Sequence, residues 1–403
     1  MKVNLDILTG SIATNRRTTD MYPQNPNLAP VSAINPSGHK SALKIVLAVA
    51  AGLVALLLGL LVLLLIGFET GPVALLIGFV SATLPVPLYL MLVLWIDRYE
   101  SEPFWMLATA FLWGALVAVF VAFVFNTASS TIVAVVTESA EAGETFGAVV
   151  SAPIVEETAK GLILFILYFK RDEFDGVVDG IVYAGMAGLG FAMTENIQYY
   201  GRAVLESGGG GLTAVFILRG TIAPFSHPLF TSMTGIGLGV ARQSRSMVLK
   251  LVAPVVGLLL AIAMHSIWNG SVAIFGGVGF LLAYLVIMVP AFVIILVVIF
   301  LALRREGQVV REFLQPDFQG GLLTQKEYDQ LCTIRGRMGA SFNAFSRGGV
   351  GSWRASRQAN QMASELAFHR SRVARGISRQ DAREREALYQ AALHNLLQRL
   401  RQG

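Results

Sequence analysis

Long apolar stretches recur along this chain from Leu43 to Leu303, and each is long enough to cross a lipid bilayer. A helix needs about 20 residues to cross about 30 Å of hydrocarbon. Hydrophobic residues make up 54% of the 403 residues and charged residues 14%, against about 25% charged residues in soluble domains. The sequence therefore predicts an all-α, polytopic membrane helix bundle. About eight transmembrane helices are expected, over residues 43–67, 73–96, 104–126, 147–169, 177–199, 212–240, 248–268 and 272–303.

Lys and Arg concentrate in alternate connections between these stretches. They precede the first span, follow the fourth, separate the sixth from the seventh and follow the eighth. Because short loops rich in Lys and Arg stay in the cytoplasm, both termini are predicted to be cytoplasmic. The expected location is the cell membrane. The expected organisation is a disordered cytosolic segment over 1–40, a transmembrane core over 41–303 and a soluble, Arg-rich helical tail over 304–403.

The basic character of the chain lies mostly in this tail, which holds 17 Lys and Arg against 9 Asp and Glu. The remaining positive charge lies in short loops beside apolar spans, so it indicates membrane topology and the lipid bilayer rather than nucleic acid as a partner. Three roles stay open for the tail. It lies on the anionic inner leaflet, binds a partner, or is a solvated appendage.

Small residues gather in the predicted fifth and sixth spans, where they allow two helices to approach closely. Gly180, Gly188 and Gly190 lie in the fifth span, and Gly235 and Gly239 in the sixth. We therefore expect these two helices to pack against each other at the centre of the bundle.

Charged and polar side chains concentrate in four consecutive predicted spans. A charge at mid-membrane costs about 3 kcal/mol on insertion scales, so such residues are candidates for function. His227 lies between Pro224 and Pro228, and an interrupted backbone at membrane depth is tolerated where it lines a watery cavity. The candidate residues are Glu156, Glu157 and Lys160 in the fourth span, Glu195 in the fifth, His227 in the sixth, and His265 and Asn269 in the seventh.

These residue types fit peptide hydrolysis in two ways. In the first, His227, His265 and Glu195 hold a Zn²⁺ ion whose bound water becomes nucleophilic, and Glu156 or Glu157 accepts the proton of that water. In the second, a buried Glu activates water without a metal, while His265 and Asn269 stabilise the oxyanion. Lys160 lies three and four residues after the two Glu, so it shares a helix face with them.

The order of these motifs resembles the PrsW family of intramembrane proteases, which is related to the CAAX-processing endopeptidase and bacteriocin-immunity superfamily. The resemblance covers roughly residues 75 to 305 and also includes the acidic loop from Asp97 to Pro103. The matching segments are E-E-x-x-K at 156–160, F-x-x-x-E-N at 191–196, the helix of His227 and H-x-x-x-N at 265–269.

The resemblance implies a membrane-bound endopeptidase that cuts membrane-tethered protein substrates, such as anti-sigma factors. It favours a metalloprotease with zinc on Glu195, His227 and His265, and with Glu156, Glu157, Lys160 and Asn269 as catalytic residues. The CAAX branch carries His where this chain has Glu195 and resembles a glutamate-type protease, so a metal-free mechanism is the alternative.

Two readings from other classes of protein compete with a protease. Buried Glu and His also mark ion paths in proton-coupled transporters, but these usually show internal repeats with broken helices at matching positions. In this chain the polar residues are confined to the fourth to seventh spans. A non-catalytic membrane scaffold is the other alternative, and the complete set of polar residues argues against it.

Overall fold

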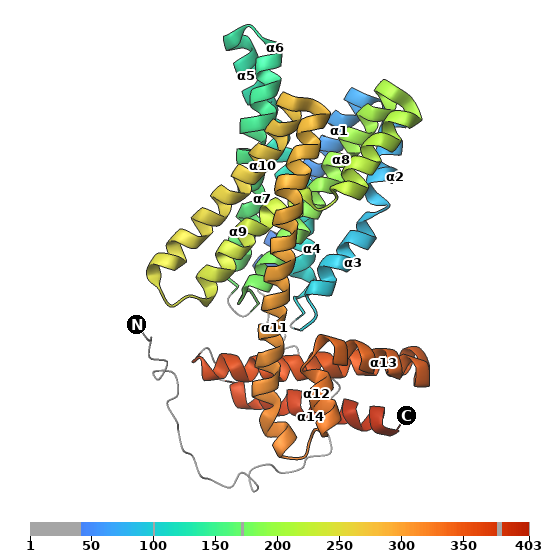
Figure 1. The fold of residues 1–403 in the computed structure, drawn as a ribbon, viewed down its shortest axis with the longest axis vertical. Helices are drawn as coiled ribbons and strands as arrows, with labels where there is room; N and C mark the ends of the chain where they lie inside the picture. Colours follow the sequence, from blue (N-terminus) through green and yellow to red (C-terminus); the bar gives the residue numbers. More distant parts are fainter. Residues whose placement is uncertain (1–41, 100, 171–172, 377–380, 403) are drawn as a thin grey trace. The chain divides into compact units, whose positions relative to one another are not determined.

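The structure, a computed structural model, describes residues 42–99, 101–170, 173–376 and 381–402, and the residues in these ranges form helices and no strands (Figure 1). The predicted disordered segment 1–40 lies outside them. The α-helices are α1 Ala42–Thr70, α2 Pro72–Thr83, α3 Val86–Ile96, α4 Phe104–Leu112, α5 Val119–Thr137, α6 Ala140–Phe146, α7 Ala152–Tyr168, α8 Val177–Val215, α9 Ser226–Gln243, α10 Met247–Ala283, α11 Val289–Gln319, α12 Gln325–Leu331, α13 Ile334–Ala374 and α14 Ala382–Gln402. Short π-helical segments, η2 Trp113–Ala118, η3 Gly147–Ser151, η4 Phe216–Ile222 and η5 Tyr284–Met288, interrupt or join them.

Five stretches of the described chain are long and apolar enough to cross a membrane, as expected of a multi-pass membrane protein. The last two are 67 and 73 residues long, far more than one crossing needs. α7, the fourth predicted span, is outside the five and carries Glu156, Glu157 and Lys160. The five are Ile45–Thr70, Pro72–Ile96, Phe104–Thr137, Val177–Gln243 and Met247–Gln319.

Each of the two longest stretches contains a glycine with a left-handed backbone conformation. Gly208 in α8 has φ +60° and Gly276 in α10 has φ +57°, values that residues with a Cβ rarely adopt. In Figure 1 the chain rises along α10 and descends along α11 after Gly276. These two stretches are therefore helical hairpins rather than single rods.

The centre of the bundle is the pair α8 and α9. In the most apolar window of Val177–Gln243, 83% of the residues are buried inside the protein, against 17% in Ile45–Thr70. A Cβ on Gly180 would lie 2.1 Å from the carbonyl oxygen of Gly235, and a Cβ on Gly235 would lie equally close to that of Gly180. The predicted close contact of these two helices is confirmed, and only glycine permits it.

α11 leads from the bundle into the helices of the tail. The sequence predicts that the tail begins at residue 304. α11 continues without a break past this residue, so no helix end marks the boundary, which stays a prediction. The apolar core follows α11 from Ile299 through Leu314 to Leu366 of α13 and Leu393 of α14. α13 turns back on itself at Gly348 and Gly349, and the tail is thus a folded helical unit built around the end of α11.

Candidate functional site

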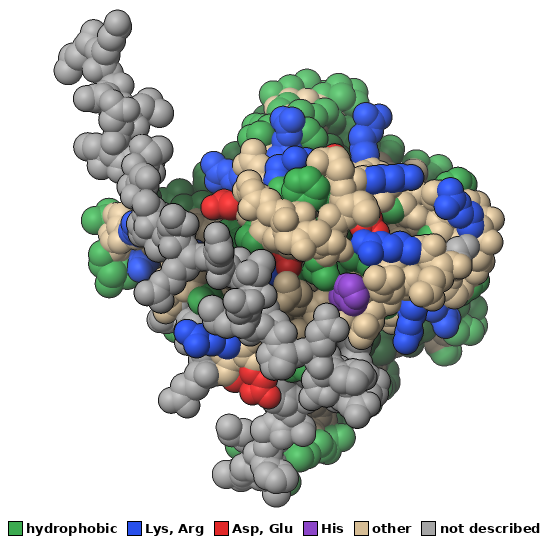
Figure 2. Space-filling view, turned by 90° about the horizontal axis from the view of Figure 1, so that it is seen from below, with side chains coloured by type: hydrophobic (Ala, Val, Ile, Leu, Met, Phe, Trp, Pro, Cys, Tyr) green, Lys and Arg blue, Asp and Glu red, His purple; other side chains and the backbone are tan. Residues whose placement is uncertain are grey.

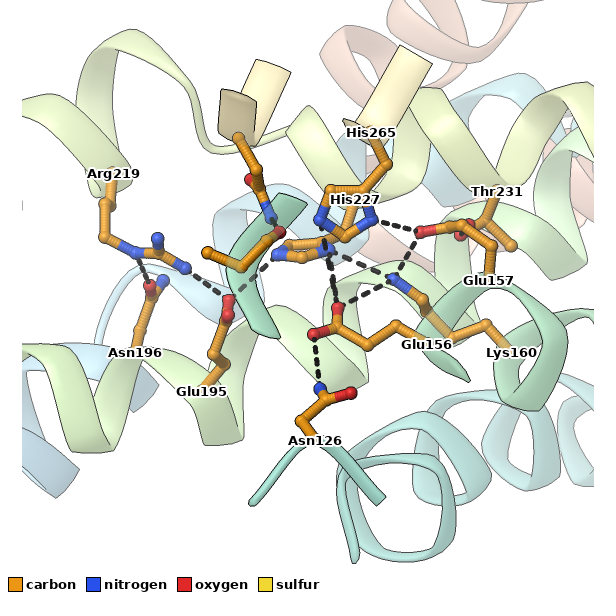
Figure 3. A network of polar contacts seen from close by, with 12 residues as sticks. Asn126, Glu156, Glu157, Lys160, Glu195, Asn196, Arg219, His227, Thr231 and His265 are labelled. Carbon is orange, nitrogen blue, oxygen red and sulfur yellow. Dashed lines mark hydrogen bonds and ion pairs between the residues drawn. The ribbon is translucent and has the colours of Figure 1, made fainter. Parts of the chain in front are cut away.

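Four helices bring the predicted polar residues together inside the bundle (Figure 3). α7 contributes Glu156, Glu157 and Lys160, and α8, α9 and α10 contribute Glu195, His227 and His265 respectively. All of these except Glu195 are buried, and Glu157 and Lys160 are fully buried. The prediction that these spans supply one polar chamber agrees with their positions in the structure.

Lys160 lies at the middle of the cluster. Its Nζ is 2.6 Å from Glu157 Oε1, 3.6 Å from Glu156 Oε2 and 3.1 Å from His227 Nδ1. It also lies 4.3 Å from the centre of the Phe191 ring, so that one cation is surrounded by two carboxylates, an imidazole and an aromatic face. A buried charge requires such partners, because leaving it unpaired is costly.

A carboxylate fixes the orientation of each imidazole. Glu157 Oε1 lies 3.0 Å from His265 Nδ1, and Glu195 Oε2 lies 2.8 Å from His227 Nε2. A carboxylate can only accept, so these nitrogens donate, and in the neutral imidazole the other nitrogen carries a lone pair. The lone pairs are then on His265 Nε2 and His227 Nδ1.

Both of these nitrogens face Glu156. Its Oε2 lies 3.9 Å from His227 Nδ1 and 4.0 Å from His265 Nε2, and it is buried without a hydrogen-bond partner. Ligand atoms of the three residues all lie within 4.8 Å of one another, a spacing that suits one metal ion. Two imidazoles, each held by a carboxylate on its far nitrogen, together with a free carboxylate oxygen, match the donor set and the outer shell of a zinc site.

Glu195 lies next to His227 but outside the group of residues whose spacing suits a metal ion. The prediction made Glu195 the third metal ligand, but its carboxylate is bonded to His227 Nε2 and is paired with Arg219, whereas the metal-sized group contains Glu156. Sequence spacing could not separate the two, because Glu195 and Glu156 are on different helices and both reach His227.

A cavity of about 1010 Å³ opens beside the cluster. Glu156, Glu195, His227, His265 and Asn269 line it, together with residues of α1 and α5 on its other side. Glu157 and Lys160 are not among the lining residues. Glu156 is therefore the member of the adjacent pair that faces the chamber.

The backbone is interrupted directly before His227. η4 ends at Ile222, and Ala223 departs from helical geometry before α9 begins at Ser226. Pro224 lacks the N–H that a continuous helix would need here. The predicted interruption of the sixth span is confirmed, and it brings the first turn of α9, with His227, to the edge of the cavity.

Three polar residues of the site were missed by sequence reasoning. Arg219 of η4 pairs with Glu195 and donates from Nε to Asn196 Oδ1 at 2.6 Å. Thr231 donates to Glu157 Oε2 at 2.8 Å, and Asn126 donates to Glu156 Oε1 at 3.5 Å. The rule that singled out the buried Glu and His would also have found Arg219, a charge within the sixth predicted span.

Asn269 lies at the wall of the cavity. One of its amide hydrogens is donated to the carbonyl oxygen of Ala148 at 2.9 Å. This bond ties α10 to η3. The role predicted for Asn269, donation to the oxyanion, would therefore use its second amide hydrogen.

A second cluster of buried acids lies where α3 and α4 are joined. Asp97 accepts from the backbone N–H of Glu102 at 2.9 Å, the hydroxyl of Tyr183 donates to Glu102, and Asp179 accepts from the N–H groups of Asp175 and Gly176 at 2.7 Å each. Burial raises the pKa of Asp97, the N–H of Glu102 lowers it and the nearby Asp179 carboxyl raises it, which together leave it at about 8.

Comparison with known proteins gives a consistent assignment. The family model described as PrsW family intramembrane metalloprotease matches residues 102–295, which include every residue of the site. Protease PrsW of Bacillus subtilis is 30% identical over 43% of this chain and 71% of its own length, and that of Oceanobacillus iheyensis is 26% identical over 58% of this chain and 97% of its own. Protease PrsW of Geobacillus kaustophilus is 34% identical over 36% of this chain, a match that spans 58% of that relative.

No solved structure gives a significant match. The matched residues hold both buried histidines and all three glutamates of the cluster, and the tail after residue 295 lies outside them. The chain therefore belongs to the PrsW family of intramembrane metalloproteases.

Proposed function

We propose that this protein is an intramembrane endopeptidase that hydrolyses membrane-tethered protein substrates, of which anti-sigma-factor-like regulators are one class. The observation that carries the proposal is Glu156 Oε2, a buried carboxylate oxygen without a hydrogen-bond partner, facing the imidazole nitrogens of His227 and His265 that carry the lone pairs. The family assignment and the adjoining cavity support the same activity. A cavity of about 1010 Å³ has room for an extended peptide segment of a few residues.

Glu156, His227 and His265 would hold the metal, with zinc the ion that suits one carboxylate and two imidazoles. When bound, zinc supplies a water molecule of lowered pKa and polarises the scissile carbonyl. Glu157 and Glu195 keep the imidazoles oriented by accepting from their far nitrogens. Lys160 and Thr231 hold Glu157 in turn.

In this scheme Glu195 would accept the proton of the attacking water through a second water molecule, because its carboxylate is bonded to His227 Nε2, on the far side of the ring from Nδ1. It lines the cavity, whereas Glu157 does not, and Arg219 fixes its carboxylate from the opposite side. The proton then passes to the leaving amine, as general acid–base catalysis requires. Asn269 steadies the cavity wall through its bond to Ala148.

The metal-free mechanism is the second candidate, and the position of Lys160 favours it. Its Nζ lies 3.1 Å from His227 Nδ1, the same nitrogen that a metal would need. With Lys160 in that position, Glu156 itself would take the proton from water. Asn269, through its second amide hydrogen, and His265, with both ring nitrogens protonated, would stabilise the oxyanion.

Eight membrane crossings, with both termini in the cytoplasm of a cell membrane, fit this function. Support comes from the five apolar stretches, from Gly208 and Gly276 dividing the last two, and from α7 as the crossing that carries the site. The Lys and Arg of alternate connections support the orientation.

The test is cleavage of a panel of membrane-tethered reporter substrates in proteoliposomes. Wild type is expected to cut at least one of them, and Glu156→Ala and His265→Ala to cut none while remaining monodisperse. Glu141→Gln, which changes an exposed acid of α6 that does not line the cavity, is the control and is expected to match wild type. Full activity of Glu156→Ala and His265→Ala would overturn the assignment, and inhibition of wild type by a zinc chelator separates the two mechanisms.

A further inference from the structure

The first half of α13 carries an apolar stripe that no other part of the described protein covers. Met338, Phe342 and Phe345 are 54%, 74% and 49% exposed. Their spacing of four and three residues puts them on one face of the helix. Exposed Phe side chains in a row mark a binding surface more often than an ordinary protein surface.

The other side of the same helix is already packed. Arg337 is buried and lies 4.3 Å from the centre of the Tyr99 ring, and Ser341 is 3.1 Å from Ser356 across the hairpin of α13. The helix therefore rests on the tail and on the loop after α3 through one face. The described residues therefore leave most of the stripe exposed.

The stripe begins beside the lipid-facing side of the bundle. Arg98 donates to Met338 Sδ at 3.3 Å, and its guanidinium lies 3.8 Å from the centre of the Trp95 ring. Trp95, like Met91 one turn earlier, is about half exposed or more on a helix that crosses the membrane. The apolar surface of α3 thus continues through Trp95 and Arg98 onto α13, at the depth where Trp side chains meet headgroups.

The charge of this segment has a single sign. Residues 334–364 contain five Arg and no Asp or Glu. Of these arginines, Arg337 is buried. Arg335 and Arg347 are exposed, and Arg335 lies next to the stripe. Figure 2 views the tail from the end that points away from the bundle, and basic side chains are common on that face as well. Such a surface complements anionic lipid headgroups.

We propose that residues 334–347 form an interfacial helix that binds the anionic leaflet next to α3, with Met338, Phe342 and Phe345 inserted at the headgroup level. A helix with an apolar face and basic flanks lies in the plane of the interface. Membrane contact here ties the tail, which shares its core with α11, to the bilayer surface. The membrane contact requires the membrane topology proposed above but no peptidase activity. The interfacial helix and the peptidase can therefore each be disproved without affecting the other.

Spin labels at two neighbouring positions test the proposal. Cys332 is the single cysteine and is buried, so a nitroxide attaches selectively to Phe342→Cys or to Asn343→Cys, both exposed positions on different faces. Each protein, with Glu156→Gln added to remove hydrolysis, is placed in vesicles of phosphatidylglycerol and phosphatidylcholine. Collision with oxygen and with a water-soluble nickel chelate is then measured by electron paramagnetic resonance.

The label at 342 is expected to favour oxygen over the chelate several-fold more than the label at 343. Arg335→Glu is expected to reduce that difference in anionic vesicles. Equal, free collision of both labels with the chelate would overturn the proposal. Shielding of the 342 label from both reagents, in detergent as well as in vesicles, would also overturn it, because a protein partner or second copy would then cover the stripe.

Discussion

Two clusters of buried carboxylates lie in this protein, and they differ in how their oxygens are satisfied. In the cluster of Asp97, Glu102 and Asp179, backbone N–H groups and a tyrosine hydroxyl donate to the acids. In the cluster on α7, Glu156 keeps an oxygen without a donor, next to two imidazoles and a cavity. Carboxylates whose oxygens all accept hydrogen bonds hold a loop in place. A carboxylate oxygen that accepts none, next to imidazole nitrogens with lone pairs, is suited to bind a metal ion.

The largest expected effect separates the two clusters by activity. Glu156→Gln should lower cleavage by at least about a thousandfold, because a ligand contributes more than the 10- to 100-fold typical of outer-shell residues. Glu102→Gln should stay within about tenfold of wild type, because Glu102 lies in the other cluster. Initial rates on a reporter substrate in proteoliposomes give both numbers, and equal losses in the two variants would remove the distinction.

The next effect is on stability. Glu157→Gln takes a charge from a fully buried site, and Lys160, His265 and Thr231 all contact that carboxylate. The loss should be on the order of 3 kcal/mol, because a buried charge loses its nearest partner. Thermal unfolding of the detergent-solubilised protein measures it against Glu141→Gln. An unchanged midpoint would mean that Glu157 does not hold the cluster together.

Arg219 allows a matched comparison between two ion pairs that line the cavity. Arg219→Gln should lower metal affinity and activity by about 10- to 100-fold, because it frees the carboxylate that orients His227. Arg202→Gln breaks the exposed pair with Glu69 and should change little, since exposed ion pairs contribute about 0–1 kcal/mol. Similar losses of activity in both variants would mean that the net charge of the cavity matters, and not the position of the Glu195 carboxylate.

The last effect is on the pH dependence of stability and concerns the Asp97 cluster. Unfolded Asp97 ionises near pH 4, whereas the buried carboxyl keeps its proton until about pH 8. The folded state therefore binds more protons in this window, and its stability falls as pH rises from about 4 to about 8. Asp97→Asn should flatten this slope, by up to about 1 kcal/mol per pH unit. An unchanged slope in unfolding curves between these values would contradict the protonated state of Asp97.

Helical spacing predicted much of this site, because three residues of α7 and one from each of three following helices stand out as charges or imidazoles in apolar sequence. It could not tell which of Glu156 and Glu157 faces the cavity, since adjacent residues point about 100° apart on a helix and only neighbouring helices decide. It also could not pair Glu195 with Arg219, which lies 24 residues away.

The tail shows the same limit on a larger scale. Its helices were predicted from local pattern, but contacts such as Arg337 with Tyr99 join residues more than 200 positions apart. Such pairings depend on tertiary packing rather than on local pattern, so the role of the tail stayed open at the level of sequence.

The most direct test of the central claim, that Glu156 joins His227 and His265 at one metal, is zinc content by elemental analysis. Wild type, Glu156→Gln and Glu195→Gln are purified in detergent without chelators, incubated with zinc and freed of excess ion. The account predicts about one zinc per chain in wild type, retention at weakened affinity in Glu195→Gln and loss in Glu156→Gln. Zinc retained in Glu156→Gln but lost in Glu195→Gln would contradict it, and wild type without zinc would favour the mechanism in which Glu156 activates water directly.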